Sequence, residues 1–66
     1  MQVKINGKLE EVAGATVLDL LKAKSIDPHM VAVELNDQML ERDHLATAGV
    51  KEGDRVEFLF YMGGGR

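Results

Sequence analysis

The residues best suited to chemistry are three consecutive glycines at positions 63–65, which follow an apolar segment and stand one residue before Arg66. Glycine loses much conformational entropy on ordering and brings no side chain to a core. A segment without side chains can enter a channel that is too narrow for a Cβ atom. We therefore expect residues 63–66 to be a flexible tail that carries a terminal carboxylate into the active site of a partner.

Other reactive groups are few. The chain has no cysteine, which excludes disulfides and thiolate metal ligands. His29 and His44 are separated in the sequence and have no nucleophile or third ligand beside them, so we expect both to be surface residues. No helix follows the glycines, as a phosphate-binding loop would require. We expect no catalytic residue, no metal and no bound cofactor.

The charge balance narrows the class of partner. With 11 acidic and 8 basic residues the formal net charge is −3, which argues against nucleic acid and favours a basic protein partner. No apolar run approaches the roughly 18 residues of a membrane-spanning helix. Residues 1–5 alternate like a strand and lack the layout of a signal peptide. We therefore expect a cytoplasmic protein that does not bind membranes.

A chain of 66 residues has room for one small domain, which we assign to residues 1–62, before the tail at 63–66. Residues 2–6 alternate, and Asn6-Gly7 is typical of a type I′ turn, in which both central residues have positive φ. The return strand is less regular, because Leu9 stands at an odd position and Val12 at an even one. In a regular strand these two side chains would point to opposite faces. Either a β-bulge intervenes or one of these two side chains is exposed.

A helix is expected to begin at Thr16. Thr16 and Asp19 have the spacing of a capping box, in which each side chain binds a free backbone N–H group of the first turn. Pro28 disfavours helical backbone at the residue before it, so the helix is expected to end within residues 25–28. An apolar stripe at helical spacing is expected to face the core, and it consists of Val17, Leu20 and Leu21.

The next strand is expected at residues 31–36, followed by a turn at Asn36-Asp37 and a short return strand at 39–40. Met39 is expected to pack in the core or at an edge, and not to form a binding surface. Residues 42–49 have little periodicity, so we expect a loop with a short helical turn and Leu45 as its core anchor. The inward residues of the strand are expected to be Val31, Val33 and Leu35.

The last strand is expected to run from residue 55 to residue 62, and its side chains divide between two faces. One face carries Val56, Phe58 and Phe60. The other face carries Arg55, Glu57, Leu59 and Tyr61. Three large apolar side chains make the better core, so we expect the second face to be exposed. Leu59 and Tyr61 would then form an apolar patch that a partner buries, and Arg55 and Glu57 would stand at its rim. If the second face is instead the covered one, Val56, Phe58 and Phe60 form the exposed apolar patch.

One helix against four or five strands is an α+β architecture. The order ββαββ resembles the ThiS family, the sulfur carriers of thiamine biosynthesis, which have a ubiquitin-like β-grasp fold with a mixed sheet. The resemblance covers essentially the whole chain. The segments that carry it are Asn6-Gly7, Thr16-Val17-Leu18-Asp19-Leu20-Leu21, Val31-Ala32-Val33-Glu34-Leu35-Asn36, Gly53-Asp54 and the glycine tail.

The resemblance implies a carrier that serves as a protein substrate and is not an enzyme. In that family an adenylyltransferase related to ubiquitin-activating enzymes uses ATP to adenylate the carboxylate of the terminal glycine. Sulfur from a cysteine-desulfurase persulfide then gives a thiocarboxylate, which thiazole synthase uses. By the resemblance, Gly65 and Gly64 are the sulfur-accepting end, and Gly63 and Met62 are the tail that leads to it. Activation must come first, because a carboxylate is a poor electrophile.

Arg66 departs from the family pattern. Counting from the Gly53-Asp54 turn, the terminal glycine of the family falls on Gly65, so Arg66 is one residue too many. Its side chain would stand where the partner's channel accepts none. We expect a carboxypeptidase-like protease to remove Arg66 and expose Gly65. The alternative is that Arg66 is a remnant of cloning.

Other functions are alternatives. A carrier of the same fold could serve molybdopterin, amino-acid or other thiocofactor synthesis, although this chain is shorter than the molybdopterin type usually is. A ubiquitin-like modifier would link its glycine terminus to lysines and give conjugates of high molecular weight. A nucleic-acid-binding β-grasp module is disfavoured by the acidic charge and the single tyrosine.

Overall fold

The computed structural model of the chain describes residues 1–13 and 15–61. The expected tail, Met62, Gly63, Gly64, Gly65 and Arg66, lies outside the described residues, as does Gly14. In chain order the elements are β1 (Gln2–Ile5), β2 (Lys8–Glu11), α1 (Val17–Ala23), the 3-10 helix η1 (Pro28–Met30), β3 (Val31–Leu35), β4 (Gln38–Leu40), the 3-10 helix η2 (Arg42–His44) and β5 (Arg55–Phe60).

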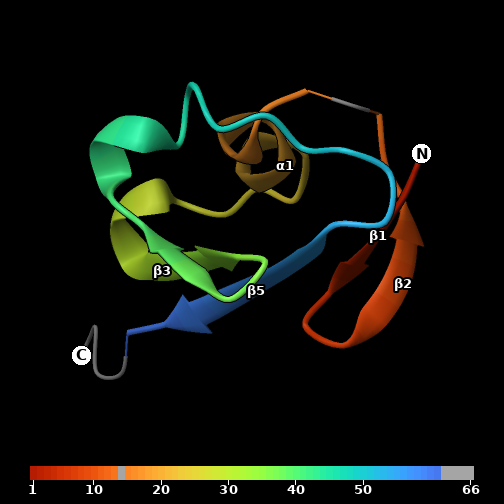
Figure 1. The fold of residues 1–66 in the computed structure, drawn as a ribbon. Helices are drawn as coiled ribbons and strands as arrows, with labels where there is room; N and C mark the ends of the chain where they lie inside the picture. The colour runs from red at the N-terminus through yellow and green to blue at the C-terminus, as the bar shows by residue number, and fades with distance from the viewer. Residues whose placement is uncertain (14, 62–66) are drawn as a thin grey trace.

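The strands of the described chain form one mixed sheet of five strands in the order β2-β1-β5-β3-β4. β5 is therefore last in the sequence but central in the sheet, and α1 lies on one side of the sheet (Figure 1). β1 and β5 are parallel, whereas the other neighbouring strands are antiparallel. This arrangement confirms the expected α+β fold with a mixed sheet and one α-helix.

The first hairpin has the expected turn, since Asn6 and Gly7 have φ angles of 50° and 82°. The ladder pairs β1 with β2 residue by residue, without a bulge. Leu9 is 59% exposed, while Val12 packs against the core. Of the two alternatives for the return strand, exposure of Leu9 is therefore the correct one.

Local hydrogen bonds define both ends of α1. The Thr16 hydroxyl accepts from the Asp19 N–H, and the Asp19 carboxylate accepts from the Thr16 N–H, both at 3.2 Å, which confirms the capping box. At the other end Ser25 has a φ of 58°, a left-handed conformation that closes the last turn. The helix thus ends before the constraint from Pro28 applies. No helix within residues 1–13 and 15–61 is long and apolar enough to cross a membrane.

The core lies between α1 and one face of the sheet. Its buried apolar residues are Val3, Ile5, Val17, Leu20, Leu21, Val31, Val33, Leu45, Val50, Val56 and Phe58. The expected helical stripe and the expected anchor Leu45 all belong to this set. Leu35 is half-buried and packs against the margin of the core. Because the core includes Val56 and Phe58 of β5, this strand is anchored from its start to Phe58.

Candidate functional site at the carboxyl end of β5

β5 is the element that leads to the expected tail. β3 pairs with it over five residues, from Val56 to Phe60, whereas β1 pairs with it only at Arg55 and Val56. In the described part of the chain, the carboxyl half of β5 therefore has a neighbouring strand on one side only. The two halves of the strand are held by different contacts.

At the amino end, a polar network surrounds Asp54, which is 8% exposed. Its carboxylate accepts from the Lys51 N–H at 2.7 Å and from the Asn36 side-chain amide at 3.0 Å. The Asn36 side-chain oxygen in turn accepts from the Arg55 N–H at 2.9 Å. Burial favours the neutral carboxyl group, but the hydrogen bonds from Asn36 and Lys51, with the charge of Lys51, hold the pKa of Asp54 below its ordinary value.

Further along β5, the side chain of Asn6 forms the hydrogen bonds that the backbone of a neighbouring strand would otherwise form. Its oxygen accepts from the Phe58 N–H at 2.7 Å, and its NH₂ group donates to the Phe58 carbonyl at 3.4 Å. β1 ends at Ile5, so without this amide the polar groups of Phe58 would face an open sheet edge. Asn6 thus extends the support of β5 by one residue pair beyond the end of β1.

Beyond Phe58 the apolar side chains lie at the surface. Leu59, Phe60 and Tyr61 are 45%, 57% and 51% exposed. Exposure of Leu59 and Tyr61 agrees with the sequence analysis, but the expectation that Phe60 lies in the core is wrong. Phe60 has the same parity as Phe58, yet it stands at the last position of β5 and is 57% exposed, although Val31 opposite it belongs to the core.

The face of β5 that points away from α1 carries Arg55, Glu57 and Leu59. They alternate with Val56 and Phe58, which are buried, so the covered face is the one expected from the sequence. Of the four residues expected at the partner-binding patch, three therefore share this exposed face. Tyr61, the fourth, is exposed just after the strand. The role of all four in partner binding stays a prediction.

Three residues that the sequence analysis did not assign to the patch share this face. Ala32 lies opposite Leu59, and Glu34 lies opposite both Glu57 of β5 and Met39 of β4. Met39 is 56% exposed on β4, an edge strand of the sheet, so of its two expected places, the core or an edge, the core is wrong. Alternation in residues 31–36 indicated which side chains of β3 point outward, but only the pairing of the strands brings them beside β5.

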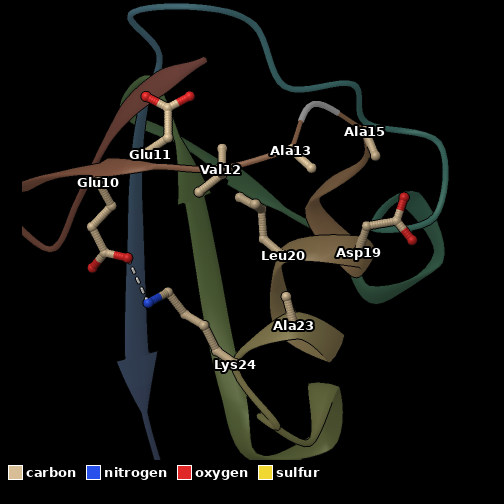
Figure 2. A pocket seen from close by; sticks show the side chains of 9 residues that line it. All are labelled: Glu10, Glu11, Val12, Ala13, Ala15, Asp19, Leu20, Ala23 and Lys24. Carbon is tan, nitrogen blue, oxygen red and sulfur yellow. Dashed lines mark hydrogen bonds and ion pairs between the residues drawn. The ribbon is translucent and has the colours of Figure 1, made fainter.

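A separate hollow lies between the end of β2 and α1 (Figure 2). An ion pair between Lys24 Nζ and Glu10 Oε1, 2.7 Å long, joins the two elements there. None of the expected site residues that the structure describes lines this hollow. Among residues 1–13 and 15–61, no three His, Cys, Asp or Glu side chains are grouped as a metal site would need.

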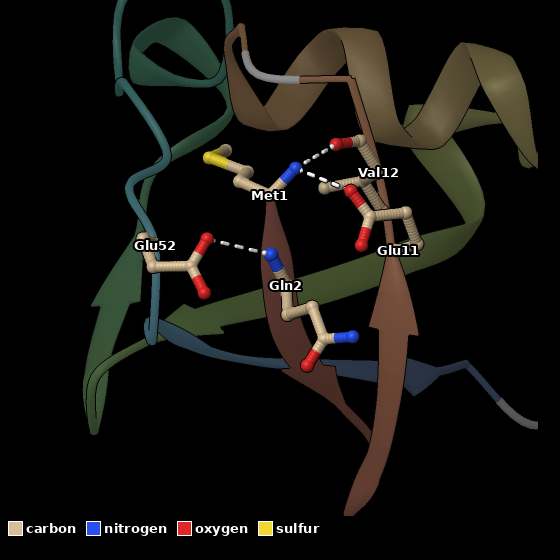
Figure 3. A network of polar contacts seen from close by, with 5 residues as sticks. All are labelled: Met1, Gln2, Glu11, Val12 and Glu52. Carbon is tan, nitrogen blue, oxygen red and sulfur yellow. Dashed lines mark hydrogen bonds and ion pairs between the residues drawn. The ribbon is translucent and has the colours of Figure 1, made fainter.

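Polar contacts also fix the start of β1 (Figure 3). The Met1 ammonium group donates to the Glu11 carboxylate at 2.6 Å and to the Val12 carbonyl at 3.0 Å. The Gln2 N–H donates to Glu52 at 2.8 Å. The hydrogen bond to Glu11 raises the pKa of the ammonium group, and the same bond lowers the pKa of Glu11. These contacts hold β1, and with it Asn6, in register beside β5.

A mixed five-stranded sheet with the last strand at its centre and a helix on one face defines a ubiquitin-like β-grasp protein. The ThiS family model matches residues 3–65, and the chain belongs to this family. It is similar to the thiamine biosynthesis protein (ThiS) from Geobacter metallireducens. The crystal structure of that protein has a TM-score of 0.85 and 42% identity, with 98% of this chain and 100% of that chain covered. A solution NMR structure of a thiamine biosynthesis protein from the same organism has a TM-score of 0.80 and 40% identity, with 100% and 90% covered.

The chain is also similar to part of two larger proteins, both named thiazole synthase. The identity is 35% over 66 residues for the protein from Paramagnetospirillum magneticum, with 98% of this chain covered. It is 31% over 67 residues for the protein from Magnetococcus marinus, with 100% of this chain covered. The chain spans 20% and 21% of the length of these two curated relatives.

Proposed function

We propose that this chain is a sulfur carrier of thiamine biosynthesis and that it acts as a protein substrate of partner enzymes, not as an enzyme. The observation that carries the proposal is the ThiS family match, which runs from residue 3 to residue 65 and so includes both the folded domain and the glycines. The pairing of β5 with β3 as far as Phe60 supports it, because a strand that is held up to its last residue gives a following segment a fixed starting point.

In this proposal the reactive group is the carboxylate of Gly65, with Gly64, Gly63 and Met62 leading to it. A partner adenylyltransferase joins the carboxylate to the AMP part of ATP and releases pyrophosphate, which makes the acyl carbon electrophilic. Sulfur from a cysteine-desulfurase persulfide displaces AMP, and a thiol cleaves the S–S bond to leave a thiocarboxylate. The chain binds no cofactor itself. A cytoplasmic location belongs to the proposal, because ATP and thiols are available there.

Thiazole synthase is the proposed acceptor of the sulfur. Two proteins that bear this name contain a region similar to almost the whole chain. Joining two units in one polypeptide raises their effective concentration, which is useful when one unit acts on the other. This similarity supports a functional pairing between the carrier and thiazole synthase. Leu59 and Tyr61, with Arg55 and Glu57 at the rim, are the proposed surface for partner enzymes.

Arg66 is not part of the family match, which ends at Gly65. We propose that a carboxypeptidase-like protease removes Arg66 before the carboxylate of Gly65 is activated. Intact-mass spectrometry of the protein from its native host should then find chains that end at Gly65. A fully active pool that still carries Arg66 would contradict this step and leave the rest of the proposal standing.

Growth tests the proposed function directly. Deletion of the gene should abolish growth without thiamine, and added thiazole precursor should restore it. A gene that encodes residues 1–65 should complement the deletion, whereas one that encodes residues 1–63 should fail, because the sulfur-accepting carboxylate is misplaced. Complementation by the shorter chain would refute the proposal. Thiamine-independent growth of the deletion strain, or abundant high-molecular-weight conjugates, would favour another pathway or a protein modifier.

A further inference from the structure

Two carboxylates stand directly opposite each other on the exposed face of the sheet, where the β3–β5 ladder pairs Glu34 with Glu57. Opposed residues in antiparallel strands have Cβ atoms about 4.5–5.5 Å apart, so like charges at such positions destabilise the sheet. Neither side chain forms an ion pair with any residue in the described ranges. The folded domain therefore carries an unfavourable pair that its own packing does not require.

The cations on this face do not neutralise the pair. Arg55 precedes Glu57 by two residues on the same strand, but its guanidinium group binds Asp37 at 2.8 Å instead. Lys4 lies beside Arg55 in the β1–β5 ladder, one strand further from Glu34. The two carboxylates are thus left facing outward without a cation in contact.

Apolar side chains frame the acidic pair. Leu59 follows Glu57 on the same face and lies opposite Ala32, while Met39 lies opposite Glu34 on the other side. A protein that covered Leu59 and Met39 would also remove water from the two carboxylates. Such desolvation is unfavourable unless the covering surface supplies a positive charge. The planar fork of an arginine, with five N–H donors, suits two neighbouring carboxylates better than a lysine does.

We propose that Glu34 and Glu57 together receive an arginine side chain of the adenylyltransferase, with Leu59 and Met39 packed against apolar groups around it. This inference rests on the proposed function, since it assigns the surface to the enzyme that activates the tail. We assign this surface to the adenylyltransferase because that enzyme acts on the chain before the tail carries sulfur. It must therefore distinguish this chain from other proteins with a free carboxylate by the surface of the folded domain.

If the proposal is correct, removal of the two negative charges should stabilise the fold and weaken binding to the adenylyltransferase. The double substitution Glu34→Gln and Glu57→Gln removes the repulsion and keeps the size of both side chains. Thermal unfolding should therefore occur at a higher temperature than in the wild type. In a pyrophosphate-exchange assay with the host's adenylyltransferase, the KM for the chain should rise at least about tenfold, as expected for loss of a charge-assisted contact. The kcat should change little, because neither glutamate belongs to the segment that carries the reacting carboxylate.

The matched control is the double substitution Glu41→Gln and Asp43→Asn, which makes the same change in net charge at exposed positions of the η2 region. This control should leave KM near the wild-type value. Raising the ionic strength should increase the wild-type KM more than that of the Glu34→Gln, Glu57→Gln variant, because only the former depends on the charged contact.

Three outcomes would overturn the inference. Equal KM values for the Glu34→Gln, Glu57→Gln variant and the wild type would remove the arginine contact and leave the proposed function intact. A fall in the unfolding temperature of that variant would show that the two carboxylates support the fold, which contradicts the argument from repulsion. Failure of the adenylyltransferase to activate the wild-type chain that ends at Gly65 would overturn both this inference and the proposed function.

Discussion

Two asparagines in equivalent hairpin turns support the two ends of β5, and they do so in different surroundings. Asn36 and Asn6 both have a φ of 50°, and both reach β5 with the side-chain amide. The Asn36 amide belongs to a network with the buried carboxylate of Asp54. The Asn6 amide instead binds the backbone of Phe58 at the point where β1 ends.

The difference shows that the two ends of one strand are held in different ways. The first two residues of β5 pair with β1, and Val56 and Phe58 carry core side chains, so the contacts of this part of the strand reinforce one another. Beyond Phe58 the strand has β3 on one side and exposes its apolar side chains. Regions with few buried contacts are the ones from which binding surfaces are normally drawn. We infer that the exposed end of β5 is available to partners because β3, Asn6 and the buried side chains together keep the strand in place.

The largest expected effect separates two phenylalanines of the same strand and the same parity. Phe58→Ala should lower the free energy of unfolding by about 3–5 kcal/mol, because it removes a buried ring. Phe60→Ala should lower it by less than about 1 kcal/mol, because an exposed side chain leaves no cavity. Urea unfolding at 25 °C measures both.

A domain of this size has only a few kcal/mol of stability, so Phe58→Ala can leave the chain unfolded. Phe58→Leu, with an expected loss of about 1.5 kcal/mol, then provides the comparison. Equal losses at the two positions would contradict the division of β5 into a buried half and an exposed half.

Acid should weaken the amino end of β5 through Asp54. Its folded-state pKa lies below the ordinary value of 3.8, so the carboxylate stabilises the fold above that value. The stabilisation is lost as the pH falls through the folded-state pKa. Asp54→Asn should cost about 1–3 kcal/mol at pH 7, because one of its acceptors becomes a donor that faces the Lys51 N–H or the Asn36 amide.

Urea unfolding of the wild type and of Asp54→Asn between pH 7 and pH 3 tests this expectation. The difference between the two chains should be constant near neutral pH and should shrink below about pH 4, where the unfolded carboxyl group becomes protonated. A difference that grows on acidification would mean that Asp54 is not held as a carboxylate in the folded chain.

Features determined by neighbouring residues were predicted well from the sequence. The Asn6-Gly7 turn needs only two residues that tolerate positive φ, and the capping box needs only Thr16 and Asp19. Parity along β5 also predicted the exposure of Leu59, because alternation is a local property of a strand.

Features determined by distant pairing were not predicted. Phe58 is buried and Phe60 is exposed although both lie past the end of the β1 pairing, and the sequence of β5 contains no sign of where the core stops. The Asn6 amide binds Phe58 across 52 positions of sequence. The opposition of Glu34 and Glu57 likewise depends on the register between β3 and β5. The glycine tail stays a prediction from composition and family resemblance, and its chemistry stays a proposal.

The two asparagines can be compared directly by substitution with glycine. Glycine tolerates the positive φ of both turns, so Asn36→Gly and Asn6→Gly remove the amide and keep the turn. Asn36→Gly should cost about 1–2 kcal/mol, because it also removes a donor to the Asp54 carboxylate. Asn6→Gly should cost about 1 kcal/mol or less, because one of its two hydrogen bonds is long.

Hydrogen exchange distinguishes the two variants by location. The Phe58 amide should exchange faster in Asn6→Gly, and the Arg55 amide should exchange faster in Asn36→Gly, since each loses its acceptor. Faster exchange of both amides in both variants would mean that β5 opens as one unit, and the two ends would then not be independently supported.

The smallest effect on stability is expected at the exposed leucines of the uncovered face. Leu59→Ser and Leu9→Ser should each change the free energy of unfolding by about 0.5 kcal/mol. Serine adds no charge beside Glu57, so any loss of binding reports the apolar contact alone. Leu59→Ser should weaken binding to the adenylyltransferase, whereas Leu9→Ser should not, because Leu9 lies on β2, two strands away from β5. Equal weakening by both variants would mean that partners bind the whole exposed face of the sheet. The carboxyl end of β5 would then not be the specific binding surface.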